Sequence, residues 1–280
     1  MTRIDQFESV FRSASKERFE MADIAIRRIL VITDLDDDGG ARFTQELTGF
    51  LSGLVSGSQV DWIEAHRTAE TVGNVLKLVQ DTTPDLICTY RNLFSHTHRW
   101  PYTLGDHVEV LTQVTDCPVL VCPRPDEDQR VWRQARRVMA MTDYIAGDHA
   151  LVQYAVAFTE AEGTLYLAHV EDGAVFDKYM DVIAKIPEIE TEIARRLIKE
   201  RLLRTAEDYA ASCVDGLASS PITVVARIRL GHHLSHYREL VRSDDVDLVV
   251  MNTKDDEQLA MHGLAYPLAV ELRERAILML

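Results

Sequence analysis

Two aspartates stand directly after short apolar runs, a position from which parallel-sheet proteins present side chains to ligands. Asp34 ends the run at residues 28–34 and Asp143 ends the run at residues 137–143, and both runs close with Thr-Asp. Ligands of open parallel sheets lie beyond the carboxyl ends of the strands, so either carboxylate could contact a ligand. A carboxylate there can also accept backbone N–H groups and cap the following turn or helix. Both interpretations stay open, and neither aspartate is predicted to be catalytic.

Two other groups of side chains match metal sites only in part. Residues 34–39 match the opening of a calcium loop, but Gln45 stands at the twelfth position, where the loop needs a bidentate glutamate. His232 and His236 have the i,i+4 spacing of a ligand pair, without an acidic partner at a diagnostic spacing. We therefore expect a solvated acidic turn, helix-start or interface histidines, and no metal site.

Motifs of the common catalytic mechanisms are missing from the sequence. There is no Gly-x-Ser-x-Gly elbow, no Gly-x4-Gly-Lys-Ser/Thr loop and no His-Glu-x2-His helix. The four cysteines form no CxxC pair, and neither Cys88 nor Cys117 shows a sequence sign of thiol activation. We therefore predict that the protein is not an enzyme.

The charge balance argues against two classes of partner. The chain has 30 Lys and Arg residues against 45 Asp and Glu residues, a formal net charge of -15. Nucleic acids and anionic membrane surfaces bind mainly through basic side chains, so neither is an expected partner. No segment approaches the roughly 18 apolar residues of a transmembrane helix, and the N-terminus lacks a signal core. We expect a cytoplasmic protein.

The chain contains an internal repeat. Besides the two Thr-Asp runs, the apolar run at residues 85–88 recurs at residues 247–250, each entered from an aspartate. Gly105 and Gly263 then stand at the same distance ahead of a final apolar run. Three landmarks in one order indicate a duplicated unit. Strand-like runs that alternate with amphipathic helical segments indicate an α/β fold of two tandem doubly wound, parallel-sheet, Rossmann-like domains.

The second copy is about 50 residues longer than the first between the first and second landmarks. This length is enough for one strand and one long helix. We interpret residues 163–170 as the extra strand and the helical period after Pro187 as the extra helix. The predicted division is a helical N-terminal extension at residues 1–25, a reduced four-strand domain at 26–125, a linker at 126–133 and a complete five-strand domain at 134–280.

One segment resembles a known family. Residues 104–121 contain a glycine, a helical segment and the run Cys-Pro-Val-Leu-Val, and this order resembles the closing helix and strand of universal stress proteins. The resemblance covers nearly all of residues 26–280 as two copies, the tandem two-domain type. It implies a fold of the adenine nucleotide alpha-hydrolase type, in which the aspartate after the first strand meets the adenosine part of a nucleotide. Asp34 and Asp143 occupy that position in the two copies.

The resemblance is incomplete where the family binds phosphates. ATP-binding members carry Gly-x2-Gly-x9-Gly-Ser/Thr, and only the final glycine is present here, as Gly105 and Gly263. Asp106 and Leu264 replace the hydroxyl residue that follows, and acids occupy residues 255–257. Such acids would repel a phosphate. We therefore predict a non-catalytic stress-response or regulatory module with degenerate ATP-binding motifs and no cofactor.

The alternative is an adenine-nucleotide-binding protein, with or without slow ATP hydrolysis, that uses the first domain and its cationic, aromatic loop at residues 90–102. ATP or AMP would then be the ligand. An adenylating or sulfur-transferring enzyme is a third hypothesis, which the missing phosphate loop disfavours. The candidate ligand-binding residues are Asp34, Tyr90, Arg91, Asn92, Arg99, Gly105, Asp143 and Gly263.

Pairing of the chain with itself is also predicted. The last strands of the two copies, near residues 119–122 and 276–280, are expected to pair within the chain and cover two edges that invite aggregation. A homodimer and a protein partner of unknown identity stay open. A helical stripe at residues 7–14 is expected to cover the sheet or the domain interface, or to bind a partner. A single continuous sheet is expected to contradict the duplication.

Overall fold

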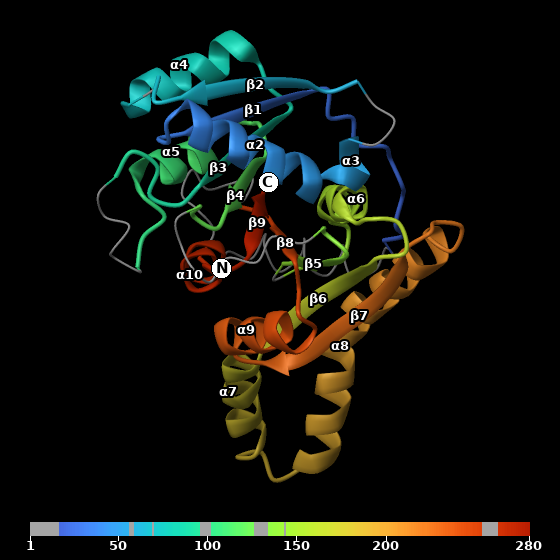
Figure 1. Cartoon of the computed structure of the whole chain (residues 1–280). Helices are drawn as coiled ribbons and strands as arrows, with labels where there is room; N and C mark the ends of the chain where they lie inside the picture. The colour runs from blue at the N-terminus through green and yellow to red at the C-terminus, as the bar shows by residue number, and fades with distance from the viewer. Residues whose placement is uncertain are drawn as a thin grey trace.

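A computed structural model describes residues 17–55, 59–68, 70–95, 102–125, 134–142, 144–253 and 263–280, and Figure 1 shows its course. The first half contains β1 (Arg28–Thr33), α2 (Asp37–Phe50), α3 (Ser52–Val55), β2 (Asp61–His66), α4 (Val72–Thr82), β3 (Leu86–Tyr90), α5 (Asp106–Val114) and β4 (Val119–Cys122). The second half contains β5 (Arg137–Met141), α6 (His149–Phe158), β6 (Thr164–Asp172), α7 (Gly173–Ile183), α8 (Thr191–Gly216), β7 (Thr223–Gly231), α9 (His233–Ser243), β8 (Leu248–Met251), α10 (Ala265–Glu271) and β9 (Ala276–Met279).

The strands of the described residues form one sheet of nine, in the order β2-β1-β3-β4-β9-β8-β5-β6-β7. Neighbouring strands are parallel, apart from β4 and β9, which are antiparallel. The sheet therefore consists of two parallel halves that meet at their last strands. The predicted pairing of these last strands is confirmed, and so is the predicted fold class.

An aspartate makes the same contact in both halves. Asp85 Oδ2 accepts the backbone N–H of Arg28, the first residue of β1, at 2.9 Å. Asp247 Oδ2 accepts the backbone N–H of Arg137, the first residue of β5, at 2.9 Å. Each carboxylate thus accepts a hydrogen bond from the first backbone N–H of the neighbouring strand, which is β1 for Asp85 and β5 for Asp247. The repeat that the sequence indicates is thus accompanied by a repeated hydrogen bond.

The strand without a counterpart is not the predicted one. β6 lies beside β5 just as β2 lies beside β1, so residues 163–170, the predicted extra strand, do have an equivalent in the first half. Within the described residues, β7 is the outermost strand of the second half and has no equivalent. The prediction was wrong because spacing along the chain does not reveal the order of strands in a sheet. The additional unit is α7, α8 and β7.

The expectation that a continuous sheet contradicts a duplication is also wrong. Pairing the last strands of two units necessarily joins their sheets. The strand direction reverses at the β4–β9 junction, and the order β2-β1-β3-β4 of one half matches β6-β5-β8-β9 of the other. The division at residues 1–25, 26–125, 126–133 and 134–280 stays a prediction.

Helices cover both faces of the sheet (Figure 1). α3 packs against α6, and the Tyr209 hydroxyl of α8 lies 3.1 Å from His149 Nδ1 of α6, so these helices share one face. α4 packs against α5 and α9 against α10, and Tyr266 of α10 donates to Glu109 Oε1 of α5 at 3.0 Å on the other face. Because both faces are covered, β3, β4, β8 and β9 are buried at every residue.

Polar contacts reinforce the apolar junction between the halves. Leu120 and Leu278 pair across it, and both are fully buried. The Thr253 hydroxyl, just after β8, lies 2.6 Å from the carbonyl oxygen of Leu280 and 3.2 Å from that of Thr112. One side chain thus ties the end of β9 to helix α5 of the other half.

The segment ahead of β1 is not helical where the structure describes it. Residues 17–27 form no helix. Phe19 is buried, and its N–H donates to the Ser212 hydroxyl of α8 at 3.0 Å, so contacts with α8 hold this segment in place of helical hydrogen bonds. The predicted helical extension therefore does not reach residue 25. Its stripe at residues 7–14 lies outside the described residues.

Replacing Leu278 by aspartate tests the junction. The side chain is fully buried between β4 and β8, so a charge there is expected to lower the free energy of unfolding by about 4 kcal/mol or more, or to leave the protein insoluble. Arg273→Ala, at an exposed position in the turn before β9, is the control and is expected to unfold like the wild type. Solubility and urea-induced unfolding measure the effect. A Leu278→Asp protein with wild-type stability would contradict this account of the junction.

Candidate functional site

The carboxylate of Asp34 is held by groups of its own chain. Asp34 follows β1 at the carboxyl end of that strand. Its Oδ1 accepts the Tyr90 hydroxyl at 2.5 Å, and its Oδ2 accepts the Phe94 backbone N–H at 2.9 Å. The Tyr90 oxygen also accepts the Asp34 N–H at 3.0 Å. Tyr90 ends β3, so two neighbouring strands bring these groups together at the edge where ligands of such folds lie.

Arg124 joins these groups from the next strand. It follows β4, and its guanidinium lies 3.4 Å from the Asp34 carboxylate. The same guanidinium lies 5.1 Å from the centroid of the Tyr90 ring and donates to the Asn92 carbonyl oxygen at 3.2 Å. The side chains of Arg124 and Asp34 are only 11% and 15% exposed. A charge pair this buried needs further hydrogen bonds, which Tyr90, Phe94 and Asn92 supply.

The hydroxyl of Tyr90 is a donor at neutral pH. Burial, followed by the hydrogen bond to Asp34, raises the pKa of Tyr90 well above its ordinary value. The phenol therefore stays protonated and donates to the carboxylate. We call Asp34, Tyr90, Phe94 and Arg124 the Asp34 cluster. In this cluster, both oxygens of the Asp34 carboxylate have partners: the Tyr90 O–H, the Phe94 N–H and the Arg124 guanidinium.

Asp34 does not cap a helix. The N-cap of α2 is Asp36, whose Oδ1 accepts the Gly39 N–H at 2.9 Å. The interpretation of Asp34 as a helix cap is therefore wrong, because Asp36 stands closer to the helix start and takes that role. Asp34 instead stabilises the turn after β3 through Phe94. In the second half, Asp148 is the N-cap of α6, and Asp143 lies outside the described residues.

Gly105 allows the loop after β3 to approach the start of α5. Its φ of 90° would strain any other residue. A Cβ at this position would come 2.8 Å from the Cα of Asn92, closer than such atoms can approach. Asn92 N–H donates to the Leu104 carbonyl oxygen at 2.7 Å, which fixes the two segments together. Close backbone packing is thus sufficient to explain this glycine.

Among the described residues that were predicted as ligands, Arg91 and Gly263 are not part of the Asp34 cluster. Arg91 is 2% exposed and donates to the carbonyl oxygen of Leu272, at the end of α10, at 3.2 Å. Its guanidinium thus contacts the second half of the chain, and its role as a ligand residue stays a prediction. A Cβ on Gly263 would meet no described atom within 4 Å. Arg99 lies outside the described residues, as Asp143 does.

Sequence reasoning missed Arg124 and Phe94. Arg124 stands between two prolines beside the predicted linker, so its charge suggested an exposed crossing. Its place directly after the strand next to β3 was a usable signal, because the carboxyl ends of parallel strands converge on one edge. Phe94 acts through its backbone N–H, for which a side-chain pattern carries no signal.

Acids occupy the two helix N-termini nearest the Asp34 cluster. The first turn of α2 contains Asp37 and Asp38, and the first turn of α5 contains Asp106 and Glu109. The helix dipole favours negative charge there, so these acids stabilise their own helices. A phosphate at either end would meet carboxylates as well as open N–H groups.

The histidines near Gly231 lie at a helix start, as expected. His232 is the N-cap of α9, and His236 Nδ1 lies 3.0 Å from the His232 carbonyl oxygen. Within the part of the chain that the structure describes, His, Cys, Asp and Glu side chains form no group of three or more suited to a metal ion. The described helices also include none that is long and apolar enough to cross a membrane.

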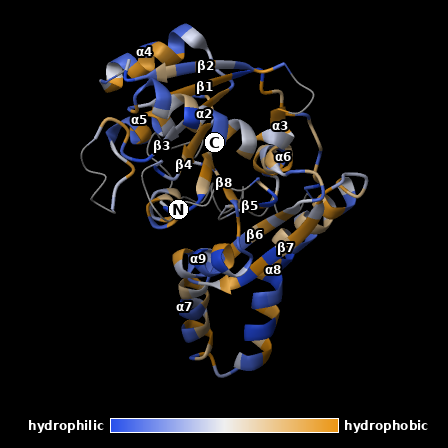
Figure 2. Cartoon of the chain, in the orientation of Figure 1, coloured by the Kyte–Doolittle hydropathy of each residue, from blue (hydrophilic) through white to orange (hydrophobic). Residues whose placement is uncertain are grey.

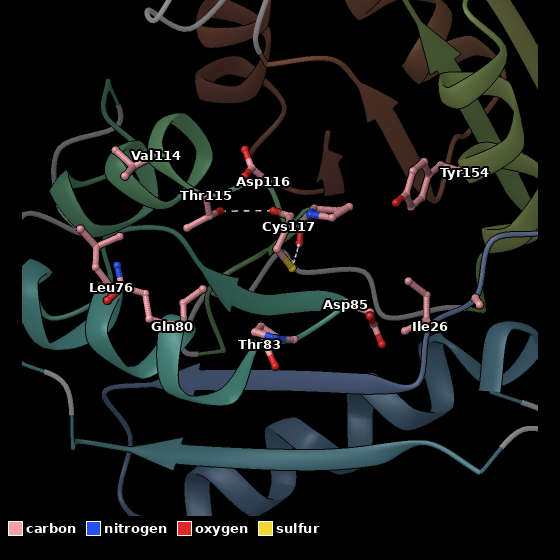
Figure 3. A pocket seen from close by; sticks show the side chains of 14 residues that line it. Ile26, Leu76, Gln80, Thr83, Asp85, Val114, Thr115, Asp116, Cys117 and Tyr154 are labelled. Atoms are coloured by element: carbon pink, nitrogen blue, oxygen red, sulfur yellow. Dashed lines mark hydrogen bonds between the residues drawn. The ribbon is translucent and has the colours of Figure 1, made fainter.

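A cavity of about 590 Å³ lies at the amino ends of the strands of the first half, away from the Asp34 cluster (Figure 3). Helices α4, α5 and α6 contribute to its walls, and Cys117, Asp85 and Tyr154 line it. Asp85 accepts the backbone N–H groups of Arg27 and Arg28 there. The carboxylate of this cavity therefore already has a structural role in starting β1.

Three cysteines have thiols that burial keeps protonated. Burial raises the pKa of Cys117 and of Cys213 each to about 12. It also raises the pKa of Cys88 well above its ordinary value. The thiolate is the nucleophilic form of cysteine, so none of these three thiols is activated near neutral pH.

The two repeated glycines provide a matched pair of variants. Gly105→Ala is expected to lower the free energy of unfolding by about 1–3 kcal/mol, because it forces a left-handed residue and a clash with Asn92. Gly263→Ala, the same change at the equivalent landmark, is expected to have a smaller effect, because no described atom lies near its Cβ position. Chemical unfolding measures both. Equal losses at the two sites would contradict the packing role of Gly105.

Alkylation tests the protonated state of the thiols. At pH 8, Cys117 in the folded protein is expected to react with iodoacetamide at least about 100-fold more slowly than free cysteine, because little thiolate is present. The rate is expected to rise as the pH approaches the pKa of about 12. Mass spectrometry of labelled peptides measures the rate, and urea-unfolded protein is the control. Rapid labelling of Cys117 in the folded protein at pH 8 would show that the thiol is activated after all.

Comparison with known proteins adds the fold relationship. No protein-family model matches the chain, and no curated protein matches it. A functionally unknown protein from Pseudomonas aeruginosa PAO1 is similar in structure over 91% of this chain and 92% of its own, with a TM-score of 0.53 and 15% identity. A protein provisionally named a universal stress protein, from Pseudomonas aeruginosa UCBPP-PA14, is similar over 91% of this chain and 93% of its own, with a TM-score of 0.51 and 15% identity. The chain shares the fold of these two proteins over nearly its whole length.

Proposed function

We propose that the protein is a non-catalytic regulatory module of the universal stress protein type, in which the chain's own side chains fill the nucleotide position of the first half. The fold shared with a protein of that provisional name supports the family, as does the closing segment at residues 104–121. The Asp34 cluster supports the loss of nucleotide binding. The proposal includes no cofactor and a role in the response to stress.

The engagement of the Asp34 carboxylate carries this proposal. In ATP-binding members of the family, the aspartate at this position meets the adenosine part of the nucleotide. Here the Tyr90 hydroxyl, the Phe94 N–H and the Arg124 guanidinium already contact its two oxygens. An adenosine would have to displace them, and Arg124 would then lose its partner in a nearly buried site. Breaking a buried charge pair in this way is strongly unfavourable, so the ligand would bind weakly.

The phosphates of a nucleotide would meet a second obstacle. Asp106 and Glu109 stand in the first turn of α5, which in this fold type points toward the phosphates. Two like charges about 4 Å apart repel by about 1 kcal/mol in bulk water and by more near a protein surface. A triphosphate would add several such repulsions.

Nucleotide binding by the first half is the alternative, and it requires a different arrangement. Asp34 would have to be released from Tyr90 and Arg124, and a cation would have to reach the phosphates. Arg91, the cation predicted for this purpose, is buried at the contact with Leu272. The described geometry therefore favours the regulatory module over a nucleotide-binding protein.

Calorimetric titration of the full chain with ATP, ADP and AMP tests the proposal. At millimolar nucleotide we expect no heat of binding and no rise in the thermal midpoint, because Asp34 is engaged and acids face the phosphates. Binding with a dissociation constant below about 1 mM, an affinity of about 4 kcal/mol, would contradict the proposal and support the alternative.

A double variant separates the two obstacles. Tyr90→Phe with Arg124→Ala removes the hydroxyl and the guanidinium from Asp34 while the acids of α5 remain. This variant is expected to gain affinity for adenosine, which has no phosphate, and to stay without affinity for ATP. Adding Asp34→Ala is expected to abolish the gain. Equal adenosine binding by the wild type and the double variant would show that the cluster does not block the site.

A further inference from the structure

Helices α7 and α8 form a hairpin that extends away from the sheet, at the bottom of Figure 1. Arg195 of α8 pairs with Asp177 of α7 at 3.8 Å and lies 5.8 Å from the centroid of the Phe176 ring. The two helices therefore lie side by side and run in opposite directions. The hairpin belongs to the additional unit of the second half.

One side of this hairpin carries large apolar side chains that are 40–60% exposed. Together they present on the order of 500 Å² of apolar surface, the size of the largest patch on a typical monomer, which is often functional. In Figure 2, α7 contains both hydrophobic and hydrophilic residues, and the protruding part of α8 is largely hydrophilic. We call this set the hairpin face. Its members are Val175, Tyr179, Val182, Ile186, Ile189, Ile193 and Leu197.

Helical spacing explains why these residues share a face. The three members within α7 recur at intervals of four and three residues, and Ile193 and Leu197 of α8 are four apart, so each set lies on one side of its helix. Phe176 and Met180 of α7 are buried and point inward. The exposed set on α7 therefore points to one side of the contact with α8. On α8 the half-buried residues Ala194 and Ile198 likewise stand one position after the exposed Ile193 and Leu197. In antiparallel neighbours, this same offset between exposed and inward residues places both sets on one side of the hairpin.

The charges beside the hairpin face are self-complementary. Arg204 stands seven residues after Leu197 and therefore lies on the same side of α8, and Glu190, seven residues before Leu197, is the N-cap at the start of that helix. Both are exposed. If two copies of α8 cross antiparallel with their Leu197 residues opposite each other, Glu190 of each copy lies opposite Arg204 of the second copy.

We propose that the hairpin face is a dimer interface, on which a second copy of this chain packs antiparallel about a two-fold axis at Leu197. Two hairpins stacked in this way form a four-helix arrangement with an apolar centre. The pairing of Glu190 with Arg204 occurs twice, as an isologous interface requires. The apolar face with its charged margin approaches the roughly 800 Å² per partner of a stable interface.

The sheet junction also favours the hairpin as the contact between copies. Last strands are the edges through which units of this fold can pair, and here β4 and β9 already pair within one chain. A second copy therefore needs another surface. The hairpin face carries both an acid and a base at its margin, so an identical copy complements its charges. A surface of uniform charge, such as an anionic membrane, would complement them less well.

Sedimentation equilibrium of the full chain over a concentration series tests the proposal. The wild type is expected to reach twice the chain mass of 31.7 kDa. Leu197→Glu is expected to weaken the dimer by at least about 30-fold, because a charge enters the centre of the interface. Val214→Glu is the matched control, since Val214 is an exposed apolar residue of the same helix, outside the hairpin face. It is expected to dimerise like the wild type.

Charge reversal tests the orientation and does not depend on the Leu197 variant. Glu190→Arg and Arg204→Glu are each expected to weaken the dimer, because each places like charges opposite one another. The protein with both reversals is expected to recover the wild-type dissociation constant. Circular dichroism and thermal unfolding of every variant establish that it is folded.

Several outcomes would overturn the proposal. A wild-type chain that stays monomeric throughout the series would exclude the dimer. A dimer that persists in folded Leu197→Glu protein would place the interface elsewhere. Folded double-reversal protein that does not recover would exclude the antiparallel pairing of Glu190 with Arg204. A monomeric wild type that sediments with phosphatidylcholine vesicles would show that the hairpin face contacts lipid instead.

Discussion

The antiparallel pairing of β4 with β9 is the interaction on which the rest of the structure depends. It joins two parallel half-sheets into one sheet and buries both last strands completely. Long-range contacts converge on it: Arg91 reaches the end of α10, and Thr253 reaches both α5 and the end of β9. Once the last strands are paired within the chain, they are not open to another molecule. Surfaces that stay open to another molecule include the edge strands and the α7–α8 hairpin.

The same junction explains why one predicted ligand residue has a structural role. Arg91 follows β3, close to the Asp34 cluster in sequence, but the neighbouring half offers its guanidinium a helix end to contact. The place beside Asp34 is taken by Arg124, which leaves the sheet from β4. Under the proposed function, the segments that lead to and from the junction occupy the position at which a nucleotide would lie.

Much of the fold could be predicted from the sequence, because short apolar runs and repeated landmarks report on buried parallel strands. Asp85 and Asp247 were recognisable as equivalent, and they make the same hydrogen bond. The identity of the extra strand, β7, could not be predicted, since only the sheet order distinguishes it from β6. In the site, Asp34 and Tyr90 could be predicted from their places at strand ends. The contribution of the Phe94 N–H could not, because it depends on the path of the backbone.

Hydrogen exchange of the strand amides, measured by mass spectrometry, tests most directly whether the two halves are one body joined at β4 and β9. The account predicts that amides of β9 exchange as slowly as those of β3 and β4, and that they become exposed together on mild denaturation, since strands of one cooperative unit open together. Rapid exchange in β9 while β3 and β4 stay protected would mean that the halves fold separately, and it would contradict the account.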